Sequence, residues 1–439
     1  KTKHNEVAPG QHELACIYES GNLATDHNQI VMETMKQIAP DFGLACLLHE
    51  KPFAGVNGSG KHNNWSMSTS TGENLLDPGK TPFENARFLL FLAAVIKAVD
   101  DHQDLLRLSV ATAGNDHRLG ANEAPPAIIS MFLGDELTAI IDAIKAGKKY
   151  NAPDAEKMTI GVDALPVFRK DATDRNRTSP FAFTGNKFEF RMVGSALSIS
   201  GPNFILNTIV ADAIKELADK LEAADDFNAT LDALIKETFE KHERIIFNGD
   251  GYSDEWLVEA EKRGLLNLPN TVEALEYFVK PENITLLDEH KVLSPIEVES
   301  REELLLENYS KIIHIEALTM LDMAKREIIP AVVKFSTEIA SAIIAKKAAI
   351  ADIDVSLEED LLKKLADATA GLKTKVEALD DAIVKAGDID ETLTNARFYG
   401  TEVFFSMQEL RAIADEAEMI TDTKIWPFPT YADLLYSVK

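Results

Sequence analysis

The sequence predicts an α+β protein whose strands are confined to its first part and are followed by a large helical region. Residues 5–18 alternate in polarity around Pro9-Gly10, as expected for two paired strands. The segment NKFEFRMV at 186–193 alternates in the same way. Residues 299–421, by contrast, are rich in Ala, Leu, Ile, Lys and Glu, which favour helices. The chemistry-bearing residue types lie in the first 200 residues.

The other elements follow from periodicity and turn residues. Residues 43–49 form an apolar run that we expect to be buried, and WSMSTS at 65–70 alternates like a strand. Pro330 should kink or break the helix that contains it. Helices are expected at 22–38 (capped by Asn22 or Asp26), 82–107 (with Pro82 near its start), 134–147, 204–224, 227–246, 253–264 and 271–279.

Composition limits the possible partners. The 439 residues carry a net charge of −27, with a pI of about 4.8, which argues against nucleic acid or an anionic membrane surface. Only two cysteines occur, so a disulfide framework and a cysteine-based zinc site are not expected, and a reducing cytoplasm fits. The longest apolar run, 88–96, is too short to span a bilayer. Because the first methionine is Met32, we expect this chain to be part of a longer protein.

EVAPGQHE, residues 6–13, is the most informative stretch. If Pro9-Gly10 forms a two-residue hairpin loop, Glu6 lies directly opposite Glu13 on one face, with Cβ atoms roughly 5 Å apart. Like charges at that distance repel, so the pair predicts a cation, and oxygen ligands favour Mg²⁺, Mn²⁺ or Ca²⁺. Two solvated carboxylates on an edge are the alternative.

The loop GVNGSGKH, residues 55–62, nearly matches a phosphate-binding P-loop. His62 replaces the hydroxyl that such loops use for magnesium, and a strand pattern rather than a helix follows. The P-loop interpretation is therefore rejected, although the glycines still allow close backbone approach to a ligand. His62 is either a metal ligand or a hydrogen-bonded loop residue.

Two further segments combine basic and acidic residues. In the polar, Gly-containing segment 107–125, Arg118 and Glu123 suit a carboxylate clamp and a general base, and a solvated polar loop is equally compatible. On a strand, Lys187, Glu189 and Arg191 share one face, opposite two phenylalanines. That charged face either lines a polar site or forms salt bridges toward solvent.

Taken in order, five motifs resemble the catalytic domain of glutamine synthetases, best those of the type III class. They are EVAPGQHE (6–13), NGSGKHNNWS (57–66), RLGANEAP (118–125), NRT (176–178) and KFEFR (187–191). The resemblance covers residues 1 to about 215. It implies an antiparallel β-sheet catalytic domain of the glutamine synthetase/guanido kinase type, joined to a helical C-terminal extension.

The resemblance also implies an activity: ATP-dependent ligation of ammonia to L-glutamate through γ-glutamyl phosphate. It implies Mg²⁺ or Mn²⁺ as cofactor and a ring-shaped homo-oligomer. The implied metal ligands are Glu6, Glu13, His62 and Glu189. Substrate would be bound by Asn57, Gly58, Arg118 and Arg191, and the nucleotide by Ser66, Asn64, Lys187 and Arg177. Glu123, Arg118 and Arg177 would act in catalysis.

Departures from the family pattern leave part of the site open. Lys187 stands where arginine is usual, Asn64 where some relatives have histidine, and Ala182 where another arginine is expected. The family also uses glutamates from an earlier strand and a domain of a neighbouring subunit, so this chain should hold about half a site and be inactive alone. A γ-glutamyl ligase for another amine, or a non-catalytic assembly module, is the alternative.

These observations predict three regions. Residues 1–215 would be the C-terminal part of the catalytic domain, with the metal, ATP and glutamate sites. Residues 216–298 would form a helical region with an insertion, and residues 299–439 a long-helix C-terminal region.

Overall fold

In the computed structural model the chain forms two compact units. One unit comprises Lys1–His49 with Glu303–Lys439, and the other Glu50–Glu302. The predicted boundary at 215 falls within a helix, α6 (Ser200–Glu222), so the three-region division stays a prediction. The structure describes residues 2–6, 10–15, 19–50, 60–120, 124–150, 157–158, 168–169 and 178–435.

A four-stranded sheet organises the unit 50–302. Its strand order is β3 (Asn63–Trp65), β8 (Phe188–Phe190), β7 (Phe181–Phe183) and β4 (Met131–Phe132). The first two neighbouring pairs are antiparallel, but β4 pairs with β7 in parallel. The expected antiparallel sheet is therefore mixed. A parallel pair needs a long crossover connection, and nearly fifty residues, including a helix, separate β4 from β7.

One face of this sheet is the hydrophobic core. Phe181 stacks on Phe188 with ring centroids 4.6 Å apart, and Phe183 lies 6.0 Å from Phe88 of helix α2 (Ala86–Asp101). On the same face, the Trp65 indole donates to Asn207 of α6 (2.9 Å). Alternation along β8 therefore places its phenylalanines in the core and Glu189 on the opposite face, as predicted.

The helices of this unit lie mostly where the sequence predicts them. The expected helix 82–107 is divided, because the backbone of His102 (φ −124°, ψ 37°) leaves the helical region. The remaining helices of this unit are η2 (Pro82–Glu84), α3 (Gln103–Leu108), α4 (Ala113–Asp116), α5 (Gly134–Lys145), α7 (Phe227–His242), η3 (Glu243–Ile245), α8 (Asp254–Lys262), α9 (Thr271–Leu275) and α10 (Pro281–Glu289). The short strands β5 (Lys157–Met158) and β6 (Phe168–Arg169) pair antiparallel.

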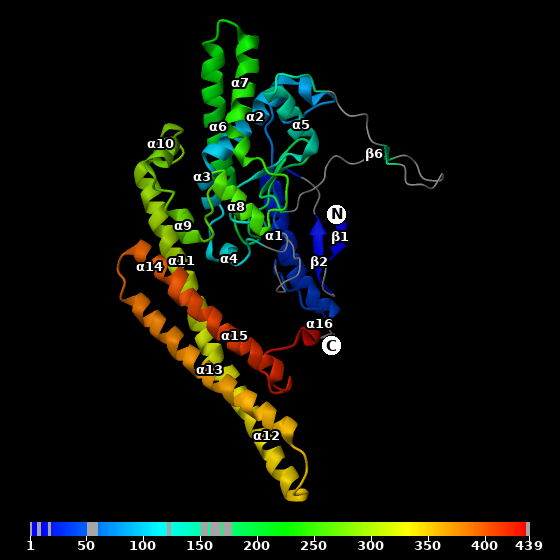
Figure 1. Ribbon diagram of the computed structural model, residues 1–439, viewed down its shortest axis with the longest axis vertical. Coiled ribbons are helices and arrows are strands. Elements are labelled where there is room, and N and C mark those ends of the chain that lie inside the picture. Colours follow the sequence, from blue (N-terminus) through cyan, green and yellow to red (C-terminus); the bar gives the residue numbers. More distant parts are fainter. Residues whose placement is uncertain are drawn as a thin grey trace. The chain divides into compact units, whose positions relative to one another are not determined.

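Long helices dominate the C-terminal part of the other unit, where α13 (Ser356–Gly387) packs against both α12 (Ile329–Ala349) and α15 (Phe404–Ile420) (Figure 1). Pro330 does not break its helix. A π-helical turn, η4 (Ala324–Ile328), directly precedes it, and such a turn accommodates the missing N–H of proline. The elements are α11 (Pro295–Met323), which starts before the unit boundary, α12 (Ile329–Ala349), α13 (Ser356–Gly387), α14 (Thr392–Phe398), η5 (Tyr399–Val403), α15 (Phe404–Ile420) and α16 (Tyr431–Leu435).

The N-terminal part of that unit consists of β1 (Thr2–Asn5), β2 (His12–Ala15), α1 (Gly21–Ile38) and η1 (Ala39–Phe42). The prediction that 43–49 is buried is wrong. Leu44 and Leu47 are 52% and 65% exposed, because this run forms no strand and no element covers it within the unit.

One continuous helix, Pro295–Ala349, is long and apolar enough to cross a membrane by length and composition. Only 17% of its most apolar window is buried within the chain. A single helix of this kind is weak evidence for a membrane span, since core helices of soluble proteins meet the same criteria.

We predict that Phe188→Ala destabilises the unit 50–302 by about 3–5 kcal/mol, because it opens a cavity in the aromatic core. Urea unfolding followed by the fluorescence of Trp65 and Trp256 measures the effect. Phe227→Ala is the matched control: this side chain is 55% exposed, so the change should stay within about 0.5 kcal/mol. Equal effects of the two substitutions would contradict this account of the core.

Candidate functional site

Three of the predicted motif segments meet on the charged face of the sheet in the unit 50–302. They are the segment around Gly60 and His62, the loop that carries Arg118, and the end of β8 with Glu189 and Arg191. A Cβ placed on Gly60 would lie 3.0 Å from Nη2 of Arg118 and 3.8 Å from Nε2 of His62. Only a residue without a side chain permits this approach without displacing the arginine.

Glu189 lies close to both Arg191 and His62 on this face. Its Oε2 accepts from Nη2 of Arg191 (3.0 Å) and lies 3.9 Å from Nδ1 of His62. Asn64 stands directly opposite Glu189 in the β3–β8 pairing. Glu189 and Arg191 are only 8% and 3% exposed, so the solvent-facing alternative for this strand is wrong at both positions. A carboxylate and an imidazole at this spacing are suitable donors for one divalent cation.

Arg118 is buried and held by several acceptors. Its Nη1 donates to the carbonyl of Met192 (3.2 Å) and to Oδ1 of Asn115 (3.3 Å), and its Nη2 donates to the carbonyl of Arg191 (3.1 Å). Nε donates to Glu50. The solvated-loop alternative for Arg118 is therefore wrong, because this guanidinium ties its loop to the end of the sheet.

Sequence reasoning missed Glu50. Its side chain is 9% exposed, and its Oε2 accepts from the backbone N–H of Ser195 (2.7 Å) while Oε1 accepts from Arg118. A lone glutamate after an apolar run has no spacing that would mark it. The directly following Lys51-Pro52 gives no such signal either.

Nearby polar residues make contacts with the backbone. Lys61 donates to the carbonyl of Leu197 (2.5 Å), and burial lowers the pKa of Lys61, partly offset by the charge of Glu50. The Ser66 hydroxyl contacts Asn74 Oδ1 (2.8 Å) and the carbonyl of Asn186 (3.1 Å), adjacent to Lys187. These contacts fix the two strand ends where the nucleotide was predicted to bind.

The hairpin β1–β2 has a different register from the predicted one. His4 pairs with Glu13, and the Glu6 N–H donates to the Gln11 carbonyl (3.0 Å), so Glu6 lies diagonal to Glu13. Glu6 and Gln11, which are joined by the last hydrogen bond between the strands, are therefore separated by four residues, not two. Gly10 has φ 73°, in the left-handed region that glycine tolerates. The shift of two residues keeps both glutamates on one face.

Other predicted site residues lie outside the described part of the chain. They are Asn57, Gly58, Glu123 and Arg177. Their roles stay predictions.

Comparisons with known proteins identify the family. Residues 1–129 match the family model of the glutamine synthetase catalytic domain, and residues 230–347 match that of the glutamine synthetase C-terminal domain. A glutamine synthetase of Butyrivibrio fibrisolvens is 47% identical over 443 residues, covering 100% of this chain and 63% of that protein. The type-3 glutamine synthetase of Dictyostelium discoideum is 46% identical, covering 99% of this chain and 60% of that protein.

The chain belongs to the glutamine synthetase family. A third relative, the glutamine synthetase of Bacteroides fragilis (strain YCH46), is 40% identical over 448 residues. This chain spans 60–63% of the length of these three relatives.

In this glutamine synthetase-family chain, two charged residues of the polar segment 107–125, Arg107 and Asp116, bind backbone and side-chain groups of residues 268–271. Arg107 is 1% exposed and donates through Nε to the carbonyl of Leu268 (2.8 Å). Asp116 accepts from the N–H and hydroxyl of Thr271 (2.9 and 2.8 Å). Burial raises the pKa of Asp116, opposed by the bonds from Thr271 and by Arg107. Asp116 therefore anchors the segment that leads to Arg118.

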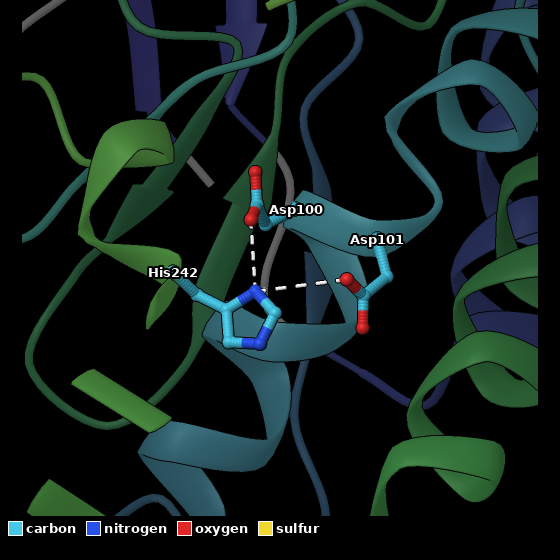
Figure 2. Close-up of side chains that lie close together, drawn as sticks. All are labelled: Asp100, Asp101 and His242. Carbon is cyan, nitrogen blue, oxygen red and sulfur yellow. Dashed lines mark hydrogen bonds and ion pairs between the residues drawn. The ribbon is translucent and has the colours of Figure 1, made fainter. Parts of the chain in front are cut away.

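A second polar cluster lies where α2 ends beside α7. His242, Asp100 and Asp101 place ligand-type atoms within 4.8 Å of one another (Figure 2). Both oxygens of Asp100 are engaged, one by His242 Nδ1 (2.8 Å) and the other by Arg244 Nε (2.7 Å). Asp101 pairs with Lys97 (2.6 Å). Because these partners already balance the carboxylates, the cluster acts as a structural tie between the two helices.

We predict that Asp100→Asn lowers the free energy of unfolding by about 2–4 kcal/mol, since it leaves buried His242 and half-exposed Arg244 without their carboxylate. Urea denaturation measures this loss. The control is Glu240→Gln, in an exposed pair with Lys236, which should change stability by less than about 0.5 kcal/mol. A loss no larger than that of the control would show that this tie is not needed for stability.

Proposed function

We propose that the complete protein ligates ammonia to L-glutamate with ATP, giving L-glutamine, ADP and phosphate. The observation that carries this proposal is the meeting of Gly60, His62, Arg118, Glu189 and Arg191 on one face of the sheet. Family membership supports it, because the relatives that match nearly the whole chain bear the name glutamine synthetase. We also propose that the sheet is that of a catalytic domain of the glutamine synthetase/guanido kinase type.

The donor atoms fit divalent cations in two places. His62 and Glu189 would hold one ion, and Glu6 and Glu13, diagonal on one face of their hairpin, would hold another. Diagonal residues of a sheet have Cα atoms about 7–8 Å apart, which long glutamate side chains can bridge through an ion. When bound, Mg²⁺ or Mn²⁺ would neutralise charge on the ATP phosphates.

The chain's own residues would then bind and orient the reactants. Arg118 and Arg191 would hold the carboxylates of glutamate, with Asn57 and Gly58 beside them. The side-chain carboxylate of the substrate glutamate would attack the γ-phosphorus of ATP, releasing ADP and forming γ-glutamyl phosphate. Nucleotide contacts would come from Ser66, Asn64, Lys187 and Arg177.

Ammonia would complete the reaction by displacing phosphate from γ-glutamyl phosphate. Glu123 would accept a proton from ammonium, and its loop would exclude water, which would otherwise hydrolyse the acyl phosphate. We further propose a homo-oligomeric ring, because the family places part of each site on a neighbouring subunit. We also propose a cytoplasmic location, because the low cysteine content fits a reducing compartment.

The complete gene product should release phosphate from ATP only when glutamate and ammonium are both present, measured by coupled ADP release and by glutamine formation. The competing function is a γ-glutamyl ligase for another amine, such as a polyamine. Turnover with polyamines and none with ammonium would replace the proposed substrate. Absence of turnover with any amine would favour an assembly module.

We predict that Glu189→Gln raises the Mg²⁺ concentration needed for half-maximal activity by at least about tenfold, because it removes a charged ligand. Activity titrated against Mg²⁺ measures this shift. Glu73→Gln is the control, since Glu73 pairs with Arg87 on an exposed surface (2.7 Å). An unchanged Mg²⁺ dependence in Glu189→Gln would remove Glu189 from the metal site.

A further inference from the structure

Glu50 connects three segments of the site. Its Oε1 accepts from Arg118 in the loop after α4, and its Oε2 accepts from Ser195 after β8. It also lies beside Gly60, whose added Cβ would be 3.7 Å from Oε1. With 9% of its side chain exposed, this carboxylate is largely removed from water, and it has a cationic partner and a backbone donor.

The contacts of Arg118 show what this carboxylate does. A guanidinium has five N–H donors. Among the described residues, four of these donors are directed at protein acceptors: Nε at Glu50, Nη1 at Asn115 and the Met192 carbonyl, and Nη2 at the Arg191 carbonyl. The fifth is on Nη2, which would lie 3.0 Å from a Cβ added at Gly60.

This geometry limits how Arg118 can bind a substrate. Bidentate recognition of a carboxylate requires two parallel N–H groups on one edge of the guanidinium. The edge formed by the two Nη atoms contacts the carbonyls of 191 and 192, and Nε contacts Glu50. Within the described part of the chain, Arg118 therefore keeps one N–H that no protein acceptor takes, and its protein partners fix the orientation of that N–H.

We infer that Glu50 is a positioning residue that sets Arg118 to contact the carboxylate of the amino-acid substrate through a single Nη2–H. The inference rests on the proposed function, because it concerns the glutamate site. Glu50 also holds the backbone at Ser195, so it aligns the loop of Arg118 with the segment that follows Arg191. It acts through Arg118 and does not itself touch the reacting atoms.

The kinetic test compares Glu50→Gln with the wild-type complete protein and with Glu73→Gln. We expect KM for glutamate to rise by about tenfold or more in Glu50→Gln, with KM for ATP changed less than about twofold, as for loss of a residue that orients a ligand-binding group. Glu50→Asp keeps the charge but shortens the side chain, so its KM for glutamate should lie between those of the wild type and Glu50→Gln. A lower KM for glutamate in Glu50→Gln would show that Glu50 competes with substrate, and would overturn the inference.

A second measurement is independent of activity. Trypsin cleavage after Arg118, followed by mass spectrometry, should be about tenfold faster in Glu50→Gln, because loss of the buried pair favours local opening of this loop. The thermal unfolding midpoint should fall as well, because the buried guanidinium of Arg118 loses its carboxylate partner, but cleavage at other sites should rise less than cleavage after Arg118. Unchanged cleavage after Arg118 would reject the positioning role. Faster cleavage without glutamate-dependent turnover of the wild type would reject the proposed function and keep the structural link.

Discussion

The buried guanidinium of Arg118 is the constraint on which the site depends. A charge removed from water must have acceptors, and Arg118 finds them on chain segments about seventy residues away in each direction: Glu50 on one side, and the carbonyls of Arg191 and Met192 on the other. Asn115 completes the link, since its amide also donates to the Met192 carbonyl (2.8 Å). Removing these acceptors would leave a buried charge unpaired, so the segments must fold together.

Successive side chains along β8 point to opposite faces of the sheet, so its apolar residues lie on one face and its charged residue on the other. The phenylalanines of β7 and β8 pack on one another and on Phe88 of α2, which fixes the strands and therefore the direction of Glu189. On the charged face, Glu189 and Arg191 are buried and paired with each other, whereas His62 and Asn64 are exposed. The rigid aromatic side thus holds the polar side at a defined spacing, as a site that must orient reactants requires.

Sequence predicted the features that depend on local pattern. The alternation of KFEFR predicted the correct faces for Phe188 and Glu189. The close approach of a ligand to the glycines of 55–60 stays a prediction, and at Gly60 the neighbouring group is the Arg118 side chain. The hairpin register failed because turn geometry, not the position of Pro9-Gly10 alone, decides which residues pair. The run 43–49 failed because apolar composition does not say whether another element covers it. Glu50 could not be found, because its partners are close only in the folded chain.

Charge balance shows why this site needs cations beyond its own residues. The chain carries −27 overall, which repels ATP and glutamate at a distance. Among the described residues around Gly60, three are cationic (Arg118, Arg191 and Lys61) and two are anionic (Glu50 and Glu189), which leaves one positive charge in excess. That excess suits a single carboxylate but not a triphosphate as well. Divalent ions at the carboxylates would reverse the local balance, so the same glutamates that neutralise the arginines would recruit the charge that phosphoryl transfer needs.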